Sequence, residues 1–276
     1  MTTGMSAVVE TRPGELVDLL TADFQRRAEP QFAWKSLVSQ FLALSGLRGF
    51  WPMSSVYYTA SPRVPDASGQ GNDLDDNNTV TFGYDNLIPY AGFVAASTQY
   101  LDRADGGASN WADIIGTESY IVAGDRGLTL GGWFYFNTTD VACALLSKWL
   151  VAGNERSFHL FRGALNDVVF EISVDGTAIT QLAGGAIAAS AWYYIVGRFT
   201  PSTEMAVFIN GTKYTNIVSI PAALNDSATA FEIGRTNAAS YLDGYASMCF
   251  LCATALSDAI IGQLYEQSRV AYGVLS

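Results

Sequence analysis

Residues 205–217, MAVFINGTKYTNI, decide the fold class of this chain. Polar and apolar side chains alternate on both sides of Asn210-Gly211, and a two-residue Asn-Gly loop between such runs is a strong signal for a β-hairpin. The physical reason is that a type I′ turn needs a positive φ angle at both central residues, which asparagine and glycine tolerate. The stretch therefore predicts two antiparallel strands joined by a tight turn.

A second hairpin is predicted in residues 168–179, VVFEISVDGTAI, around Asp175-Gly176, with Phe170, Ile172 and Val174 on one face. Further strands are predicted at Thr79–Tyr84, Gln99–Arg103, Leu128–Phe136, Ala144–Trp149, Ser157–Arg162, Trp192–Thr200, Ala230–Arg235 and Gly244–Leu251. Roughly ten strands with short turns and almost no helix between them indicate a mainly β protein, an antiparallel sandwich or jelly roll.

The composition excludes some classes of protein. With 49% hydrophobic and 15% charged residues among 276, the chain has ample material for a folded core and is not a disordered protein. The net charge of −11 and the scattered basic residues repel phosphate backbones, so we expect no nucleic-acid partner. The same acidity can recruit a cation.

Three cysteines offer limited chemistry. Cys249 and Cys252 have the C-x-x-C spacing of a redox or zinc half-site, but only Cys143 and His159 remain as further ligands. The surrounding residues, YASMCFLCATAL, are typical of a strand. We therefore expect buried, reduced thiols, which fits folding in a cytosol.

The N-terminus, MTTGMSAVVETRPGE, lacks a basic region followed by an apolar core, so we expect no signal peptide. The weakly polar run at 182–197 is shorter than the roughly 20 residues that a spanning helix needs. It is predicted to be a loop that feeds a buried strand. No membrane span is expected.

Helical periodicity occupies the start of the chain. Residues 15–28 and 30–46 each place apolar side chains at helical spacing. The predicted partner-binding stripe consists of Leu20, Phe24, Trp34, Leu37 and Phe41. Such helices need another surface to cover them. We thus expect a helical arm at 1–48 and a sandwich at 49–276, closed by a short helix with Ser257 as N-cap and Ile260, Ile261 and Leu264 facing inward.

Several segments resemble a laminin-G-like domain of the concanavalin A-like lectin/glucanase superfamily. They are GFWPMSS followed by PDASGQGNDL at 65–74, then TQYLDRAD, LTLGGWFYF, LLSKWLVAGNERSFHLF, and the ending FEIGRTNAASYLDGYASMCFLCATALSDAIIGQLYEQ. The resemblance covers about residues 50–276 and implies a jelly-roll sandwich. The fold serves lectins, glucanases, adhesion modules and virion proteins, so function must come from the site. A helical arm before one lectin-like sandwich is similar in layout to tailed-phage structural proteins.

The chain lacks the expected catalysts of an enzyme. Resembling glucanases carry carboxylates about two residues apart on one strand, so that a nucleophile and an acid flank one glycosidic bond. Here Glu171 and Asp175 are further apart, and Glu204 has no acidic partner on its strand. His159 falls on a strand, without a G-x-S-x-G motif. We predict that the protein is not an enzyme.

Calcium and sugar are the ligands that the residues allow. Calcium takes roughly six to eight oxygen ligands from loops, and resembling domains bind one ion at a loop rim. The candidate ligands are Asp66, Asn72, Asp73 and Asp243, with Asp75 and Asp76 nearby, although such residues also serve as ordinary turn residues. Trp149, Trp111 and Tyr241 are candidate carbohydrate-binding residues, and core packing is the alternative.

The leading hypothesis is a non-enzymatic virion structural or attachment protein of a bacteriophage, a capsid decoration or tail-associated protein assembled in the host cytoplasm. Its helical arm would dock on other virion proteins or on a second copy, and its sandwich would contact host-surface glycans. A calcium-dependent carbohydrate-binding module is the alternative, and a glucanase-like hydrolase is a more distant one.

Overall fold

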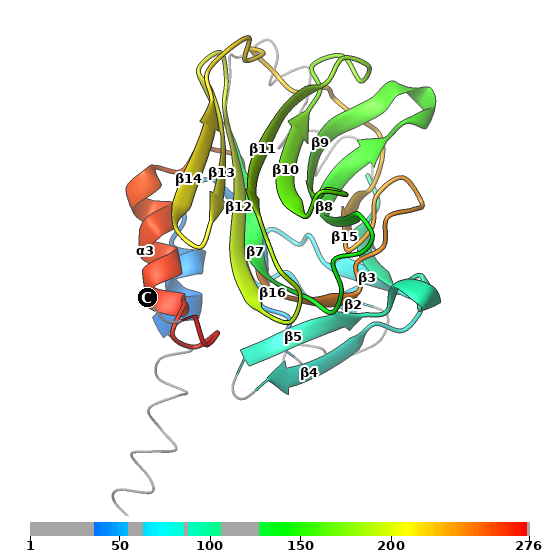
Figure 1. The fold of residues 1–276 in the computed structure, drawn as a ribbon, viewed down its shortest axis with the longest axis vertical. Coiled ribbons are helices and arrows are strands. Elements are labelled where there is room, and N and C mark those ends of the chain that lie inside the picture. The colour runs from blue at the N-terminus through cyan, green and yellow to red at the C-terminus, as the bar shows by residue number, and fades with distance from the viewer. Residues whose placement is uncertain (1–35, 55–62, 86–87, 106–126, 275–276) are drawn as a thin grey trace, which may run out of the picture. The chain divides into compact units, whose positions relative to one another are not determined.

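A computed structural model of the chain describes residues 36–54, 63–85, 88–105 and 127–274. The chain divides into two compact units, residues 1–39 and 40–276, rather than between the predicted residues 48 and 49. In the first unit, the described residues 36–39 are helical. The second unit is a β-sandwich of two antiparallel sheets (Figure 1). The predicted mainly β, jelly-roll class is confirmed.

The first sheet has the strand order β14-β13-β12-β7-β16-β5-β4, and β1 also pairs with β16. Its strands are β1 (Leu47–Trp51), β4 (Thr81–Asp85), β5 (Ile88–Phe93), β7 (Leu128–Phe136), β12 (Trp192–Thr200), β13 (Glu204–Ile209), β14 (Thr212–Asn216) and β16 (Gly244–Cys252). Strands far apart in sequence therefore lie side by side, as a jelly roll requires.

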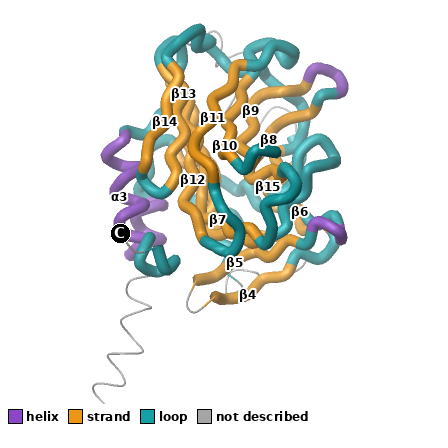
Figure 2. Tube along the Cα trace, in the orientation of Figure 1, coloured by secondary structure: helices purple, strands orange, loops and turns teal. Residues whose placement is uncertain are grey.

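The second sheet has the order β11-β10-β9-β8-β15-β6-β3-β2. Its strands are β2 (Arg63–Val64), β3 (Leu74–Asn77), β6 (Tyr100–Arg103), β8 (Cys143–Leu150), β9 (Glu155–Arg162), β10 (Asp167–Ile172), β11 (Thr180–Ala186) and β15 (Phe231–Ile233). Short 3-10 turns lie at η1 (Ala95–Ser97) and η2 (Ala152–Asn154). Figure 2 shows how loops connect the ends of the strands, while helix lies mainly to one side.

The core forms between the sheets because side chains alternate along each strand. On β7, Leu130, Phe134 and Phe136 face inward and are buried, and Phe170 and Ile172 meet them from the second sheet. Cys143, Cys249 and Cys252 are free and buried, as predicted.

Both predicted hairpins form, but only the one at Asn210-Gly211 has the predicted two-residue turn. Asn210 and Gly211 both have positive φ, 47° and 81°, and join β13 to β14 directly. By contrast, β10 ends at Ile172 and β11 begins at Thr180, so Val174 lies outside the strand and is exposed. The side chain of Asp175 explains the longer loop, because it accepts hydrogen bonds from two backbone N–H groups just after it. These bonds lower the pKa of Asp175 to about 2.

Two other segments differ from the sequence-based expectation. Residues 182–186, predicted as loop, belong to strand β11. The acidic run at 73–78 contains strand β3, which pairs with β2 and β6. Both are edge or half-buried strands without a strong apolar alternation, which is the signal on which the prediction relied.

The closing helix is α3 (Asp258–Ser268), and the Ser257 side chain accepts a hydrogen bond from the backbone N–H of Ile260, as an N-cap does. Ile261 and Leu264 are buried as predicted, but Ile260 is 37% exposed. The reason is that the buried stripe of α3 runs through Ile261, Leu264, Tyr265 and Ser268 instead.

α3 covers part of the outer face of the first sheet. The Trp133 indole donates a hydrogen bond of 3.0 Å to Ser268 Oγ, and the rings of Trp133 and Tyr272 stack with centroids 4.0 Å apart. Of the helices within the described residues, none has the length and apolar character needed to span a membrane.

Candidate carbohydrate-binding site

A cavity of about 300 Å³ opens at one end of the sandwich, and we call it the rim cavity. It lies where β7 and β9 end and where β8 and β16 begin. Its lining residues are Ala95, Thr138, Val141, Cys143, Arg162, Ser240, Tyr241 and Asp243. These residues come from β8 and β9 of the second sheet, from η1, and from the loops that follow β7 and precede β16 in the first sheet, so only the closed sandwich brings them together.

The loop before β16 brings two of the predicted site residues to this cavity. Tyr241 and Asp243 both line it, although the sequence suggested sugar contact for one and calcium for the other. Asp243 Oδ1 accepts a hydrogen bond of 2.9 Å from Asn137 Nδ2, and the backbone of Asn137 donates to Asp243 O at 3.0 Å. The buried Leu242 anchors the loop between them. The loop is thus held firmly to the end of β7.

Next to Tyr241, the side chains of Tyr100 and Arg235 form an aromatic and cationic cluster on the second sheet. The rings of Tyr241 and Tyr100 lie 6.4 Å apart, and the Arg235 guanidinium lies 3.4 Å from the Tyr100 ring centroid. Arg235 also forms an ion pair with Glu232. Together these contacts hold Tyr100 and Arg235 in fixed positions beside the cavity.

Arg162 supplies the buried polar group of the site. Its side chain is only 2% exposed, donates to Val141 O and to Asn166 Oδ1, and lines the cavity. Its Nε atom is buried without a hydrogen-bond partner in the protein. Sequence reasoning missed Arg162, since nothing but strand alternation marks it as inward-facing.

Cys143 also lines the cavity, but burial raises the pKa of its thiol. A protonated thiol is a poor nucleophile. The rim cavity therefore offers hydrogen bonding and aromatic contact, and its cysteine is poorly suited to nucleophilic chemistry.

The other residues predicted to bind carbohydrate lie elsewhere. Trp149 is 6% exposed on β8, and its ring packs 5.6 Å from that of His159. It does not line the rim cavity. Trp111 lies outside the described residues. His159 is buried on β9 with Nδ1 3.5 Å from Glu171 Oε2, and burial lowers its pKa so that the neutral ring is favoured.

The predicted calcium ligands Asp66, Asn72 and Asp73 form a hydrogen-bonded turn. The Asp66 carboxylate accepts from the backbone N–H groups of Phe50, Ser68 and Asn72 and from the Ser68 hydroxyl. Asp73 Oδ1 accepts from the backbone of Asp66 at 2.8 Å.

Asp243 lies at the rim cavity, apart from this turn. Among the residues that the structure describes, no three His, Cys, Asp or Glu side chains are arranged to hold a metal ion. Calcium binding stays a prediction.

Two carboxylates that sequence reasoning missed face each other across strands. Asp102 on β6 and Glu232 on β15 are register partners, and burial raises the pKa of both. Asp102 accepts a hydrogen bond from Asn77 Nδ2, while Glu232 is paired with Arg235. No pattern within one strand marks this pair, because the two residues are far apart in sequence.

The predicted partner-binding residues are only partly described. Leu20, Phe24 and Trp34 lie outside the described residues, and Leu37 is buried in the helical segment of the first unit. Phe41 is fully buried within the second unit, stacked 5.0 Å from Phe50 and edge-on to Phe250. Phe41 therefore packs in the chain's own core, and its predicted role on a partner surface is corrected.

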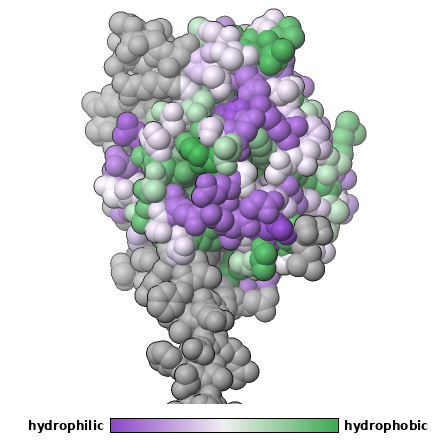
Figure 3. Space-filling view, turned by 90° about the vertical axis from the view of Figure 1, so that its left-hand side faces the viewer, coloured by the Kyte–Doolittle hydropathy of each residue, from purple (hydrophilic) through white to green (hydrophobic). Residues whose placement is uncertain are grey.

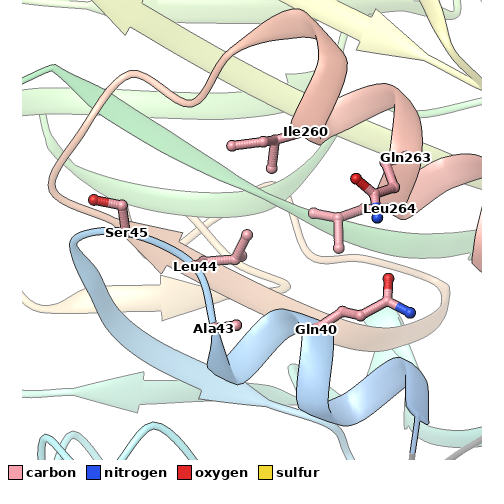
Figure 4. A pocket seen from close by; sticks show the side chains of 7 residues that line it. All are labelled: Gln40, Ala43, Leu44, Ser45, Ile260, Gln263 and Leu264. Atoms are coloured by element: carbon pink, nitrogen blue, oxygen red, sulfur yellow. The ribbon is translucent and has the colours of Figure 1, made fainter.

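A second cavity, of about 290 Å³, lies between residues 40–45 and α3 (Figure 4). Leu44, Ile260 and Leu264 give it apolar walls, and Gln40 and Gln263 stand at its edge. The surface on this side of the molecule shows broad hydrophilic bands with hydrophobic residues between them (Figure 3). Fewer polar side chains line this cavity than line the rim cavity, and none of the predicted site residues does.

Comparison with known proteins shows which solved structures and which family share this fold. No curated protein matches the chain. One similar solved structure is the binding domain of botulinum neurotoxin DC in complex with rat synaptotagmin II, with 12% sequence identity and a TM-score of 0.59. A second is of botulinum neurotoxin type C, whose cell entry depends on interaction with two ganglioside molecules, with 10% identity and a TM-score of 0.57. A third is the binding domain of Paraclostridial mosquitocidal protein 1, with 11% identity and a TM-score of 0.57.

Each similarity covers 80% of this chain, which spans about half of the other chain, 51%, 51% and 52% respectively. At these identities the likeness concerns the fold alone. The family model of the concanavalin A-like lectin/glucanases superfamily, a laminin G type, matches residues 105–262. This chain therefore belongs to the concanavalin A-like lectin/glucanase superfamily.

Proposed function

We propose that this chain is a non-enzymatic attachment protein whose lectin-like sandwich binds glycans at the rim cavity. The observation that carries the proposal is the combination of Tyr241, Asp243 and Arg162 around one cavity. A sugar offers apolar C–H faces for the aromatic ring and hydroxyl groups that both donate and accept hydrogen bonds. The three side chains match these features.

A binding role without catalysis is favoured by how the reactive groups are engaged. The Cys143 thiol is protonated because burial raises its pKa, and Glu232 forms an ion pair with Arg235. Glu171 lies beside His159 rather than beside a second carboxylate. We expect no release of reducing ends from laminarin or related β-glucans, and measurable hydrolysis would overturn this part of the proposal.

Glycan-array binding of the full chain tests the site. Tyr241→Ala and Asp243→Asn should each weaken binding about tenfold, equivalent to about 1.4 kcal/mol. Tyr84→Ala, which removes a tyrosine that is 47% exposed on β4, is the matched control and should leave binding unchanged. Equal binding by all three variants, with unaltered melting temperatures, would refute the rim cavity as the site.

Calcium dependence is decided in the same assay. If Asp243 helps to hold an ion, adding a chelator abolishes binding and adding calcium restores it. If the carboxylate contacts the sugar directly, chelation has no effect while Asp243→Asn still weakens binding.

We further propose that the protein is a virion structural or attachment component, a capsid decoration or tail-associated protein docked through residues 1–39. Support comes from the apolar stripe predicted in those residues and from their forming a compact unit of their own. The docking partner would be another virion protein or a second copy of the chain.

Deletion of residues 1–39 tests the docking proposal. The cut avoids 40–48, since Phe41 belongs to the core and β1 begins at Leu47. The shortened chain should keep its glycan binding and lose incorporation into assembled particles. Normal incorporation would refute docking through this segment.

A further inference from the structure

The outer face of the first sheet carries a row of aromatic side chains that begins beside the turn after α3, where Tyr272 lies edge-on to Trp192 with ring centroids 5.1 Å apart. Trp192 on β12, Tyr135 on β7 and Tyr245 on β16 are successive register partners, and Tyr90 on β5 continues the row diagonally. Successive ring centroids lie 5.7, 5.2 and 4.5 Å apart. We call these four residues the aromatic platform. The strands involved are neighbours in the sheet, so the row spans about 14 Å.

These side chains point outward because their neighbours on the same strands point inward. Phe134 and Phe136 flank Tyr135, and Ala246 and Ala91 adjoin Tyr245 and Tyr90; all four belong to the buried core. Strand alternation therefore turns the platform away from the interior of the sandwich.

Two glycines allow the tyrosine rings to lie down on the sheet. Gly83 is the register partner of Tyr90, and a Cβ atom at Gly83 would lie 2.7 Å from the Tyr90 hydroxyl oxygen and 2.8 Å from Cζ. Gly92 is the register partner of Tyr245, and a Cβ atom there would lie 3.3 Å from Tyr245 Cδ1. Each ring thus leans over a bare backbone on the next strand, with one face toward the sheet and the other turned outward.

The platform combines a fixed end with accessible rings. Trp192 is 6% exposed, and its indole donates to Asp85 Oδ2 at 3.2 Å. Tyr90, Tyr135 and Tyr245 are each partly exposed, as expected for rings with one covered face. Burial raises the pKa of Tyr245, with its tyrosine neighbours and nearby carboxylates adding to the shift, so its hydroxyl keeps its proton at neutral pH.

We propose that the aromatic platform is a second carbohydrate-binding surface, one that stacks the flat faces of a neutral β-linked polysaccharide chain. The partly exposed rings of Tyr135, Tyr245 and Tyr90 are tilted by 32° and 40° from one to the next, and such a row suits an extended ligand with repeated apolar faces. The carboxylates of Asp85 and Asp243 lie close enough to Tyr245 to act on it electrostatically, and the chain carries a net charge of −11. An anionic polymer is therefore disfavoured, whereas a neutral one is not.

A proline-rich peptide is the competing ligand for an aromatic surface, but its geometry fits less well. Polyproline segments dock in grooves between aromatic side chains. The rings of Tyr90 and Tyr245 instead lean over Gly83 and Gly92, which fills the space that such a groove would need. The inference does not rest on glycan binding at the rim cavity, since the platform lies on the outer face of one sheet.

Co-sedimentation of the full chain with insoluble cellulose and with chitin tests the proposal. The chain should bind at least one of the two polymers, and Tyr90→Ala with Tyr245→Ala should weaken that binding tenfold or more. Tyr245→Phe, which keeps the ring, should bind nearly as well as the original chain. Tyr84→Ala is the matched control, because Tyr84 precedes the β4–β5 turn and alternates to the face of β4 opposite Gly83.

The rim variant Tyr241→Ala separates the two sites. It should keep its polymer binding, while the double platform variant should keep any binding seen on the glycan array. Failure of one proposal therefore leaves the other measurable.

Tyrosine nitration of the original chain keeps the test independent of variants that fold poorly. Bound polymer should protect Tyr90 and Tyr245 from tetranitromethane, as mapped by mass spectrometry, and leave Tyr84 reactive. The proposal is overturned if neither polymer binds, if the double variant binds as well as the original chain, if protection is absent, or if a proline-rich peptide displaces the polymer.

Discussion

Replacing Asp66 by alanine removes the acceptor of four hydrogen bonds at the first turn of the sandwich. The donors in the backbone of Phe50 and Asn72 belong to fully buried residues, whereas Ser68 is near solvent and can bond to water. Each buried donor left without a partner costs about 1–3 kcal/mol. We expect Asp66→Ala to lower the free energy of unfolding by about 3 kcal/mol, since relaxation of the turn recovers part of the sum.

The melting temperature is the readout. For a domain of this size about 3 kcal/mol corresponds to a decrease of roughly 6–12 °C. Asp66→Asn should cost about half as much, because its Oδ1 can still accept from the backbone of Phe50 and Ser68 while the amide nitrogen faces the donor of Asn72. Asp140→Ala, at an exposed position in the β7–β8 connection, makes the same change in charge and should leave the melting temperature within about 1 °C.

Two results would refute this reasoning. If Asp66→Ala has the same melting temperature as Asp140→Ala, the hydrogen bonds of the turn contribute nothing measurable to stability. If a chelator lowers the melting temperature of the original chain to that of Asp66→Ala, and calcium restores it, then the carboxylate acts through a bound ion rather than through the turn.

Three further outcomes are expected. Ser257→Ala removes the N-cap of α3 and should destabilise the chain by about 1 kcal/mol, whereas Ser257→Asp should not; equal denaturation midpoints for both variants would count against the cap. Burial lowers the pKa of His159, so below about pH 6.5 the unfolded chain binds a proton that the native chain does not. The free energy of unfolding therefore decreases as the pH is lowered. His159→Phe should flatten this dependence between about pH 5.5 and 7.5 in urea denaturation, and an unchanged slope would contradict the assignment. Burial raises the pKa of Cys252 to about 12, and Cys143 and Cys249 are buried too, so a thiol reagent should modify them only after unfolding; fast reaction of the native chain would disprove their burial.

Local patterns were sufficient for much of the fold. Alternation placed β7 and β12 to the residue, and the Asn210-Gly211 turn formed where the positive φ angles required it. Alternation failed for β3 and β11, since an edge or half-buried strand does not need an apolar face. At Asp175 the local signal misled, because the side chain made its own turn and lengthened the loop.

The candidate sites were harder to predict. Tyr241 and Asp243 could be nominated from their loop, but the sequence assigned them different ligands. Arg162 and the pair of Asp102 and Glu232 carry no local signal, since their neighbours come from strands distant in sequence. The aromatic platform was hidden for the same reason, because its residues lie on four strands that only the sheet order makes adjacent.

The sequence by itself determined the class of the fold: alternating apolar residues and turn-forming dipeptides act over a few residues, and they suffice to specify strands, turns and the caps of a helix. Only the tertiary structure decided which strands are neighbours, which aromatic side chains are buried in the core and which remain at the surface. The physical reason is that pairing and burial depend on contacts between distant segments, and many strand orders satisfy the same local pattern. Phe41 shows this most simply, since its helical spacing suits a partner surface equally well, yet Phe50 and Phe250 enclose it.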